Sequence, residues 1–240
     1  MRWRSAVAAA LVLAPAAAQA QSLACTIPDR IAIPRLEQRP RDEPVRTPAI
    51  TGYKLSMSWS PQHCARVRNP RDARDRFQCS GENGRFGWVL HGLWPEADTP
   101  GYPQWCRPAK IVPQPVLKKH LCMTPSAQLL QHEWAKHGTC MSPHPAAYFQ
   151  AAAMLFRAVR FPDMEALAAD ARTARDVRRA FAARNRGVTE SMVAVTADRD
   201  GSLSEVSLCL GPRMRPQACK PFQKGLADRK AVRIRRMPGG

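Results

Sequence analysis

Residues 53–59 have the sequence Tyr53-Lys54-Leu55-Ser56-Met57-Ser58-Trp59, in which apolar and polar side chains alternate. Because successive side chains of a β-strand point to opposite faces of a sheet, this pattern places four apolar side chains on one face. Residues 86–90 form a second apolar strand, which we expect to end at His91. The runs 192–197 and 202–210 flank a turn-forming stretch and predict a β-hairpin. These segments indicate an antiparallel sheet.

Helix signals occupy the middle of the chain. Thr124-Pro125 is typical of an N-cap followed by proline at the first helical position, and Gly138 is a typical stop, so we expect a helix over 125–137. Three further helices are expected from Pro145 to about residue 159, over 164–171 and over 175–184, with long loops over 60–84 and 100–115. The chain contains no internal repeat and no interdomain linker, so it predicts one α+β domain with helices packed on an antiparallel sheet.

The composition is that of a globular protein with a large excess of positive charge. The 240 residues include 37 Lys and Arg against 19 Asp and Glu, a formal net charge of +18, and 45% of them are hydrophobic. This apolar fraction excludes wholesale disorder, and no apolar run is long enough for a membrane-spanning helix. The charge indicates a polyanionic partner.

The first twenty residues are typical of a secretory signal peptide. Arg2 and Arg4 precede an apolar stretch over 6–18, and Ala18-Gln19-Ala20 offers the small residues that a signal peptidase requires. We expect cleavage after Ala20 and a periplasmic or secreted protein. Because residues 1–20 contain two arginines and no acid, the mature chain would have a net charge of 18 − 2 = +16.

The cysteines agree with export. All eight follow residue 20, an even number in a chain expected to reach an oxidising compartment, and this predicts four disulfides. The smallest spacing, ten residues between Cys209 and Cys219, excludes a C-x-x-C zinc motif.

A cluster of ionisable residues lies near the end of the first expected helix, His132-Glu133-Trp134-Ala135-Lys136-His137. The two histidines are about 140° apart on a helix at ~100° per residue, whereas the pair of a zinc-protease H-E-x-x-H motif is about 40° apart. This spacing argues against a metalloprotease. The cluster itself is consistent with a solvated face of ion pairs or with a site that transfers protons and stabilises an anion.

Two segments closely resemble the active-site segments of the ribonuclease T2 family. They are Phe86-Gly87-Trp88-Val89-Leu90-His91-Gly92-Leu93-Trp94-Pro95-Glu96 and His132-Glu133-Trp134-Ala135-Lys136-His137-Gly138-Thr139-Cys140. A weaker resemblance extends from Tyr53 to Cys219 and includes Glu205-Val206-Ser207-Leu208-Cys209. Family members usually have Asp where this chain has Glu96, and the Pro-rich lead-in and the basic C-terminal tail are additions.

The resemblance implies an acid–base site without metal or cofactor. His91 and His137 would be the proton-transfer pair, with His137 as the base and His91 as the acid. His132 would bind the phosphate, and Lys136 with the catalytic Glu133 would stabilise the transition state. Histidine suits both proton-transfer roles near neutral pH.

Base-binding positions follow from the same resemblance. Trp94 matches the family position that stacks on a base, and Glu96 and Tyr102 lie at offsets where some members complete that site. A turn acid and a half-buried loop aromatic remain equal alternatives for Glu96 and Tyr102. We expect the other histidines, His63, His120 and His144, to be ordinary surface or loop residues.

The family also suggests part of the disulfide pairing. Cys106–Cys140 resembles a shared bridge, whereas Cys64–Cys79 and Cys209–Cys219 are close in sequence, which leaves Cys25–Cys122. The predicted organisation is a signal peptide (1–20), a Pro-rich lead-in with no visible chemistry (21–52), a ribonuclease T2-like domain (53–219) and a basic C-terminal tail (220–240).

The predicted function is cleavage of single-stranded RNA through a 2′,3′-cyclic phosphate and then a 3′-phosphate, with low base selectivity. We expect a monomer whose partner is its RNA substrate, and whose charge speeds RNA capture without selecting sequence. The alternative is a noncatalytic, cationic secreted protein that binds nucleic acid.

Overall fold

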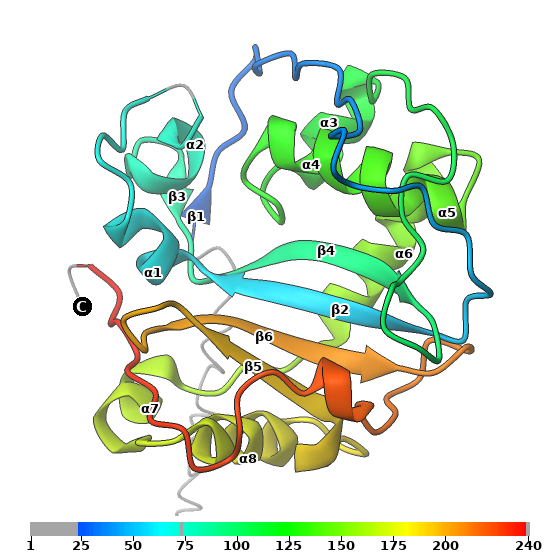
Figure 1. Cartoon of the computed structure of the whole chain (residues 1–240). Helices are drawn as coiled ribbons and strands as arrows, with labels where there is room; N and C mark the ends of the chain where they lie inside the picture. The colour runs from blue at the N-terminus through cyan, green and yellow to red at the C-terminus, as the bar shows by residue number, and fades with distance from the viewer. Residues whose placement is uncertain (1–23, 73, 239–240) are drawn as a thin grey trace, which may run out of the picture.

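The central strand of the protein contains the alternating stretch 53–59. The computed structural model describes residues 24–72 and 74–238, so the expected signal peptide lies outside the described residues. Strand β2 (Gly52–Trp59) pairs on one side with β4 (Trp88–Glu96) and on the other with β6 (Leu203–Leu210), and β6 pairs with β5 (Val193–Ala197). All three pairings are antiparallel, and helices pack on the sheet (Figure 1). The α+β prediction is confirmed.

Strand β4 is longer than expected, and His91 lies inside it. The strand continues to Glu96 because residues 92–96 pair with 52–56 of β2. The register shifts by one residue at this point: Met57 pairs with Leu90 and Ser56 pairs with Gly92. His91 is therefore the extra residue of a β-bulge, a distortion that redirects a side chain and is common beside active sites.

The α-helix expected over 125–137 is shorter than predicted and continues as a π-helix after Glu133. Helix α4 (Ala127–Glu133) begins after Ser126, whose hydroxyl caps it by accepting from Leu129 N at 3.2 Å. Thr124, the expected cap, is buried and donates to Leu90 O at 2.8 Å, so it ties the helix entrance to β4. A π-helical turn (Trp134–Gly138) and α5 (Thr139–Met141) follow α4 directly.

The later helices follow the prediction closely. They are α6 (Pro145–Ala158), which packs on β2 and β4, α7 (Met164–Asp170), and α8 (Ala174–Arg184), which packs on β5. The predicted loop over 60–84 contains two helices that the sequence patterns missed, α1 (Ser60–Ala65) and α2 (Arg76–Cys79). Further missed elements are α3 (Gln114–His120), which follows the loop over 100–115, and a small sheet of β1 (Ala24–Cys25) and β3 (Gly84–Arg85). Short 3₁₀ turns span Glu190–Met192 and Pro221–Gln223.

Four disulfides join the eight cysteines. The pairs are Cys25–Cys122, Cys64–Cys79, Cys106–Cys140 and Cys209–Cys219, the same pairs as expected. Cys106–Cys140 joins the loop after β4 to the end of the site-bearing helices. Cys25–Cys122 joins the start of the lead-in to the segment before α4.

The C-terminal residues 220–238 pack onto the domain. Val232 is buried, and Arg178 of α8, only 3% exposed, donates to Lys224 O, Leu226 O and the Asp228 carboxylate. Among residues 24–72 and 74–238, no helix combines the length and apolar character needed to cross a bilayer.

Candidate active site

The two motifs meet where the bulge of β4 faces α4 and the π-helical turn. Leu90 N donates to Met123 O at 2.9 Å, which holds the strand against the segment leading into α4. Gly92 allows the closest approach, because a Cβ at this position would overlap the Glu133 carboxylate and lie 2.6 Å from Trp94 Nε1. The turn is a π-helix with hydrogen bonds from i to i+5, which brings His137 further round toward His132 than a regular α-helix would.

Glu133 is the buried centre of the site. Its side chain is 3% exposed, and its Oε2 accepts from Trp94 Nε1 at 2.7 Å. Its Oε1 lies 3.6 Å from His91 Nε2. Burial raises the pKa of Glu133, although His91, His132 and the hydrogen bond from Trp94 oppose that effect.

His91 is held from its other side by an acid to which the sequence motifs assign no role. Nδ1 of His91 is hydrogen-bonded to the carboxylate of Glu205 on β6, which also accepts from Ser58 Oγ of β2 at 2.9 Å. Partial burial acts to lower the pKa of His91, but the hydrogen bond and charge of Glu205, with the charge of Glu133, raise it to about 9. Charge on Glu205 therefore keeps His91 protonated at neutral pH.

His137 has the opposite environment. It is 4% exposed, its Nδ1 has no hydrogen-bond partner among the described residues, and its ring stacks on Trp94 with 5.4 Å between centroids. Burial, followed by the charges of Lys136, His132 and His91, lowers the pKa of His137 well below its ordinary value. This histidine is therefore neutral at neutral pH.

His132 and Lys136 point to carboxylates from the Pro-rich lead-in. His132 Nδ1 lies 3.0 Å from Glu37 Oε1, and Lys136 Nζ lies 2.9 Å from Glu43 Oε2. Trp105 Nε1 also donates to Glu43, at 2.7 Å. No chemistry is visible in this lead-in from the sequence alone, because its prolines and mixed charges have no periodicity and both acids reach the site from more than ninety residues away.

Of the three expected base-binding residues, Trp94 and Tyr102 lie beside the two histidines. Trp94 touches both histidines, with 5.2 Å between its centroid and that of His91, and Lys54 Nζ lies 5.5 Å from its ring. Tyr102 is half-buried, with its centroid 5.5 Å from that of His137. Glu96 is buried, and burial raises its pKa, partly offset by a hydrogen bond from Gln223.

Of the remaining histidines, His63 pairs with Asp75 at 3.1 Å, and His144 is exposed before α6. His120 corrects the expectation of a surface or loop position. It lies at the end of α3, is 2% exposed and packs on Phe149, and its pKa is lowered to about 4, mainly by burial.

A cavity of about 470 Å³ opens beside His91 and His132. His91, His132 and Glu37 line one part of it, and Gln78, Gln128 and Ser58 are among the polar residues that line the rest. This volume lies within the range of small-ligand sites. Within the described part of the chain, no group of three or more His, Cys, Asp and Glu side chains is arranged to hold a metal ion.

The fold and this cluster define a disulfide-bonded α+β protein with a site for acid–base chemistry on an anion. The sequence model of the Ribonuclease T2 family matches residues 51–219, and the chain belongs to that family.

Similar proteins include a probable ribonuclease of Haemophilus influenzae, 36% identical over 122 residues, which are 47% of this chain and 44% of that protein. A ribonuclease of Aeromonas hydrophila is 42% identical over 89 residues, 37% of this chain and 36% of that protein. The matches thus span less than half the length of these relatives. The crystal structure of RNase NT in complex with 5′-AMP shares the fold, with a TM-score of 0.60 and 19% identity over 78% of this chain and 98% of that one.

Proposed function

We propose that this protein is an endoribonuclease that cleaves single-stranded RNA by acid–base transphosphorylation. One observation carries the proposal: two histidines that contact the same indole, Trp94, are tuned in opposite directions. The pKa of His91 is raised to about 9, and the pKa of His137 is lowered well below its ordinary value. A protonated acid and a neutral base thus coexist near pH 7, as general acid–base catalysis requires.

In the proposed reaction, neutral His137 takes the proton of the ribose 2′-OH. The 2′-oxygen forms a bond to phosphorus while the bond from phosphorus to the 5′-oxygen breaks, and His91 donates its proton to that departing oxygen. His132 and Lys136 hold the phosphoryl oxygens, and Glu133 stabilises and orients the protonated His91. Lys136 and the protonated His91 supply positive charge that a phosphoryl transition state needs.

The first product is a 2′,3′-cyclic phosphate, which water then opens to a 3′-phosphate as the two histidines exchange roles. Trp94, with Tyr102 and Glu96, would hold the base at the cleaved position. Stacking on an aromatic ring tolerates every base, which is consistent with low selectivity. We also propose that the protein acts as a monomer in the periplasm or outside the cell, where its four disulfides would be maintained.

The mechanism is tested with an RNA oligonucleotide that carries one 2′-deoxynucleotide, in the presence of EDTA. We expect cleavage at every other accessible position, none on the 3′ side of the deoxynucleotide, and cyclic phosphate ends by mass spectrometry. Cleavage at the deoxynucleotide, or loss of all activity in EDTA, would contradict the mechanism.

Variants assign the activity to the site. His137→Ala should lower the cleavage rate on the order of 10²- to 10⁴-fold, because it removes one member of the proton-transfer pair. His144→Ala is the matched control, since this histidine is exposed before α6. Tight RNA binding without cleavage by the wild-type protein would instead favour the noncatalytic cationic alternative.

A further inference from the structure

We call residues 26–50 of the lead-in, which follow Cys25, the strap. It precedes the family match at residues 51–219, yet both of its ends are fixed to the domain. The Cys25–Cys122 disulfide and a 2.8 Å hydrogen bond from Thr26 N to Asn83 O hold its start. Arg46 and Gln104 exchange two backbone hydrogen bonds near its end. Between these points the strap runs past α3 and α4 to reach β2 (Figure 1).

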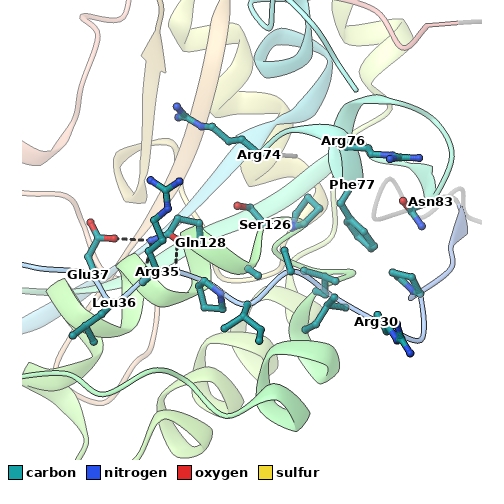
Figure 2. A pocket seen from close by; sticks show the side chains of 18 of the residues that line it. Arg30, Arg35, Leu36, Glu37, Arg74, Arg76, Phe77, Asn83, Ser126 and Gln128 are labelled. Carbon is teal, nitrogen blue, oxygen red and sulfur yellow. Dashed lines mark hydrogen bonds between the residues drawn. The ribbon is translucent and has the colours of Figure 1, made fainter. Parts of the chain in front are cut away.

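The first contact of the strap with the site is made by Glu37. Its Oε1 lies 3.0 Å from His132 Nδ1, and its Oε2 accepts from Gln128 Nε2 at 2.8 Å. Gln128 lies four residues before His132 on α4 and also accepts from Arg35 N at 2.8 Å. Figure 2 shows this arrangement, with Gln128 directed toward both Arg35 and Glu37. Gln128 therefore orients the Glu37 carboxylate toward His132.

The second contact is made by Glu43. Both of its carboxylate oxygens lie within 3.0 Å of Lys136 Nζ, and Oε2 also accepts from Trp105 Nε1. Although burial acts to raise the pKa of Glu43, the hydrogen bonds from Lys136 and Trp105 leave it below its ordinary value. The strap thus supplies one carboxylate to each of the two basic side chains, His132 and Lys136, that the proposed function assigns to the phosphate.

The strap is weakly packed between its fixed ends. Ile31 and Pro34 are the only buried residues among 26–50, and Arg39 to Asp42 are exposed. A cavity of about 930 Å³ lies between the strap and residues of α2 and α4 (Figure 2). Residues 37–43 include no buried residue, so moving them off the site would mainly break the two ion pairs and the hydrogen bonds that Gln128 and Trp105 donate to the two glutamates.

We propose that the strap is an intrinsic competitor of the substrate, in which Glu37 and Glu43 occupy the phosphate-binding side chains His132 and Lys136 until RNA displaces them. A carboxylate and a phosphate offer the same anionic oxygen acceptors to His132 and Lys136, so these two side chains cannot serve both. Because this role assumes that His132 and Lys136 bind the scissile phosphate, it rests on the proposed function.

The experiment compares the full-length E37Q/E43Q variant with D29N/D42N. The control changes the net charge by the same amount on the same strap, and the carboxylates of Asp29 and Asp42 make no ion pair with any described residue. Binding of inorganic phosphate is measured by calorimetry, and kcat and KM are measured on an RNA oligonucleotide. Partly exposed ion pairs are individually weak, so we expect phosphate affinity to rise about 3- to 20-fold in E37Q/E43Q, with a lower KM.

Three results would overturn the proposal: unchanged phosphate affinity, an equal gain in D29N/D42N, or a fall in kcat/KM of E37Q/E43Q. An equal gain would show an effect of net charge alone, and a fall would show that the glutamates assist the reaction. The phosphate measurement does not depend on RNA cleavage. Tighter phosphate binding by a protein that cleaves no RNA would therefore refute the proposed function and leave the strap as a competitor for anions.

Discussion

Glu205 has the largest influence of any single residue on the proposed acid. Its carboxylate is hydrogen-bonded to His91 Nδ1 and to Ser58 Oγ. Its hydrogen bond and charge are the main causes that raise the pKa of His91 to about 9. A carboxylate hydrogen-bonded to one ring nitrogen fixes both the orientation and the charge of a histidine. Glu205 is thus a positioning residue for the proposed reaction.

Glu205→Gln should move the alkaline limb of the kcat/KM profile to lower pH. Without the carboxylate, burial lowers the pKa of His91 unopposed by Glu205, so the acid loses its proton at a lower pH. The rate at pH 8 should fall about 10-fold or more, because each unit of pKa changes the protonated fraction about tenfold above the pKa. A pH–rate series measures this shift.

Glu190→Gln is the matched control for this prediction. Glu190 pairs with Arg175 and Arg179 on the surface, away from the described cluster, so its variant should keep the wild-type profile. If Glu205→Gln lowered the rate equally at every pH, the glutamate would support the fold and not the charge of His91.

Two local distortions of regular structure create the site. The β-bulge at His91 and the π-helical turn over Trp134–Gly138 each place one histidine where an ideal strand or helix would not. Gly92, beside the bulge, is the point at which β4 and Glu133 come closest. The two motifs therefore depend on each other through this glycine.

Gly92→Ala should disable the site more than it destabilises the fold. The added methyl group would displace the Glu133 carboxylate and the Trp94 indole, so we expect at least a 100-fold loss of kcat/KM and a stability loss of about 1–3 kcal/mol. Activity assays and urea unfolding measure the two effects.

Gly187→Ala is the control that separates the loss of activity from the loss of stability. Gly187 has a φ of +82° and open space around its Cα, so alanine there costs about 1 kcal/mol of backbone strain at a distance from the site. Activity should persist in this variant. Wild-type activity in Gly92→Ala would show that Glu133 and Trp94 tolerate displacement.

The C-terminal segment contributes to the packing of the folded domain as well as to its positive charge. Deleting residues 223–240 removes Val232 from the core and removes three partners of the buried Arg178. Arg178 would keep only the hydrogen bond from its Nε to Val193 O. A buried charge that loses most of its partners costs about 3–5 kcal/mol, so this truncation should lower the midpoint of thermal unfolding by about 10 °C or more, if the protein folds at all. Truncation after Met237 is the control and should unfold near the wild-type temperature. Equal midpoints for the two truncations would show that residues 223–237 add no stability.

The strands of the four-stranded sheet, the later helices and the candidates for the site residues could be predicted from local patterns. The alternation at 53–59 depends on neighbours two residues apart, and the pattern from Pro145 depends on neighbours three and four apart. His91, His132, Glu133, Lys136 and His137 lie in two short motifs, so their family likeness is visible without a structure. Each of these signals lies within a short, continuous stretch of sequence.

Only the tertiary structure decided the charge states of His91 and His137 and which carboxylates contact the candidate site residues. Glu205 reaches His91 across 114 residues of sequence, and Glu37 reaches His132 across 95, so neither pairing has a local signal. The bulge at His91 is seen only in the pairing of β4 with β2, and no local sequence signal marked it or the π-turn. A pKa depends on burial and on charges within a few ångströms. The sequence alone therefore determined which side chains are candidates for the site. Only packing determined which of the two histidines holds the proton in the proposed mechanism, and which carboxylates meet the side chains proposed to bind phosphate.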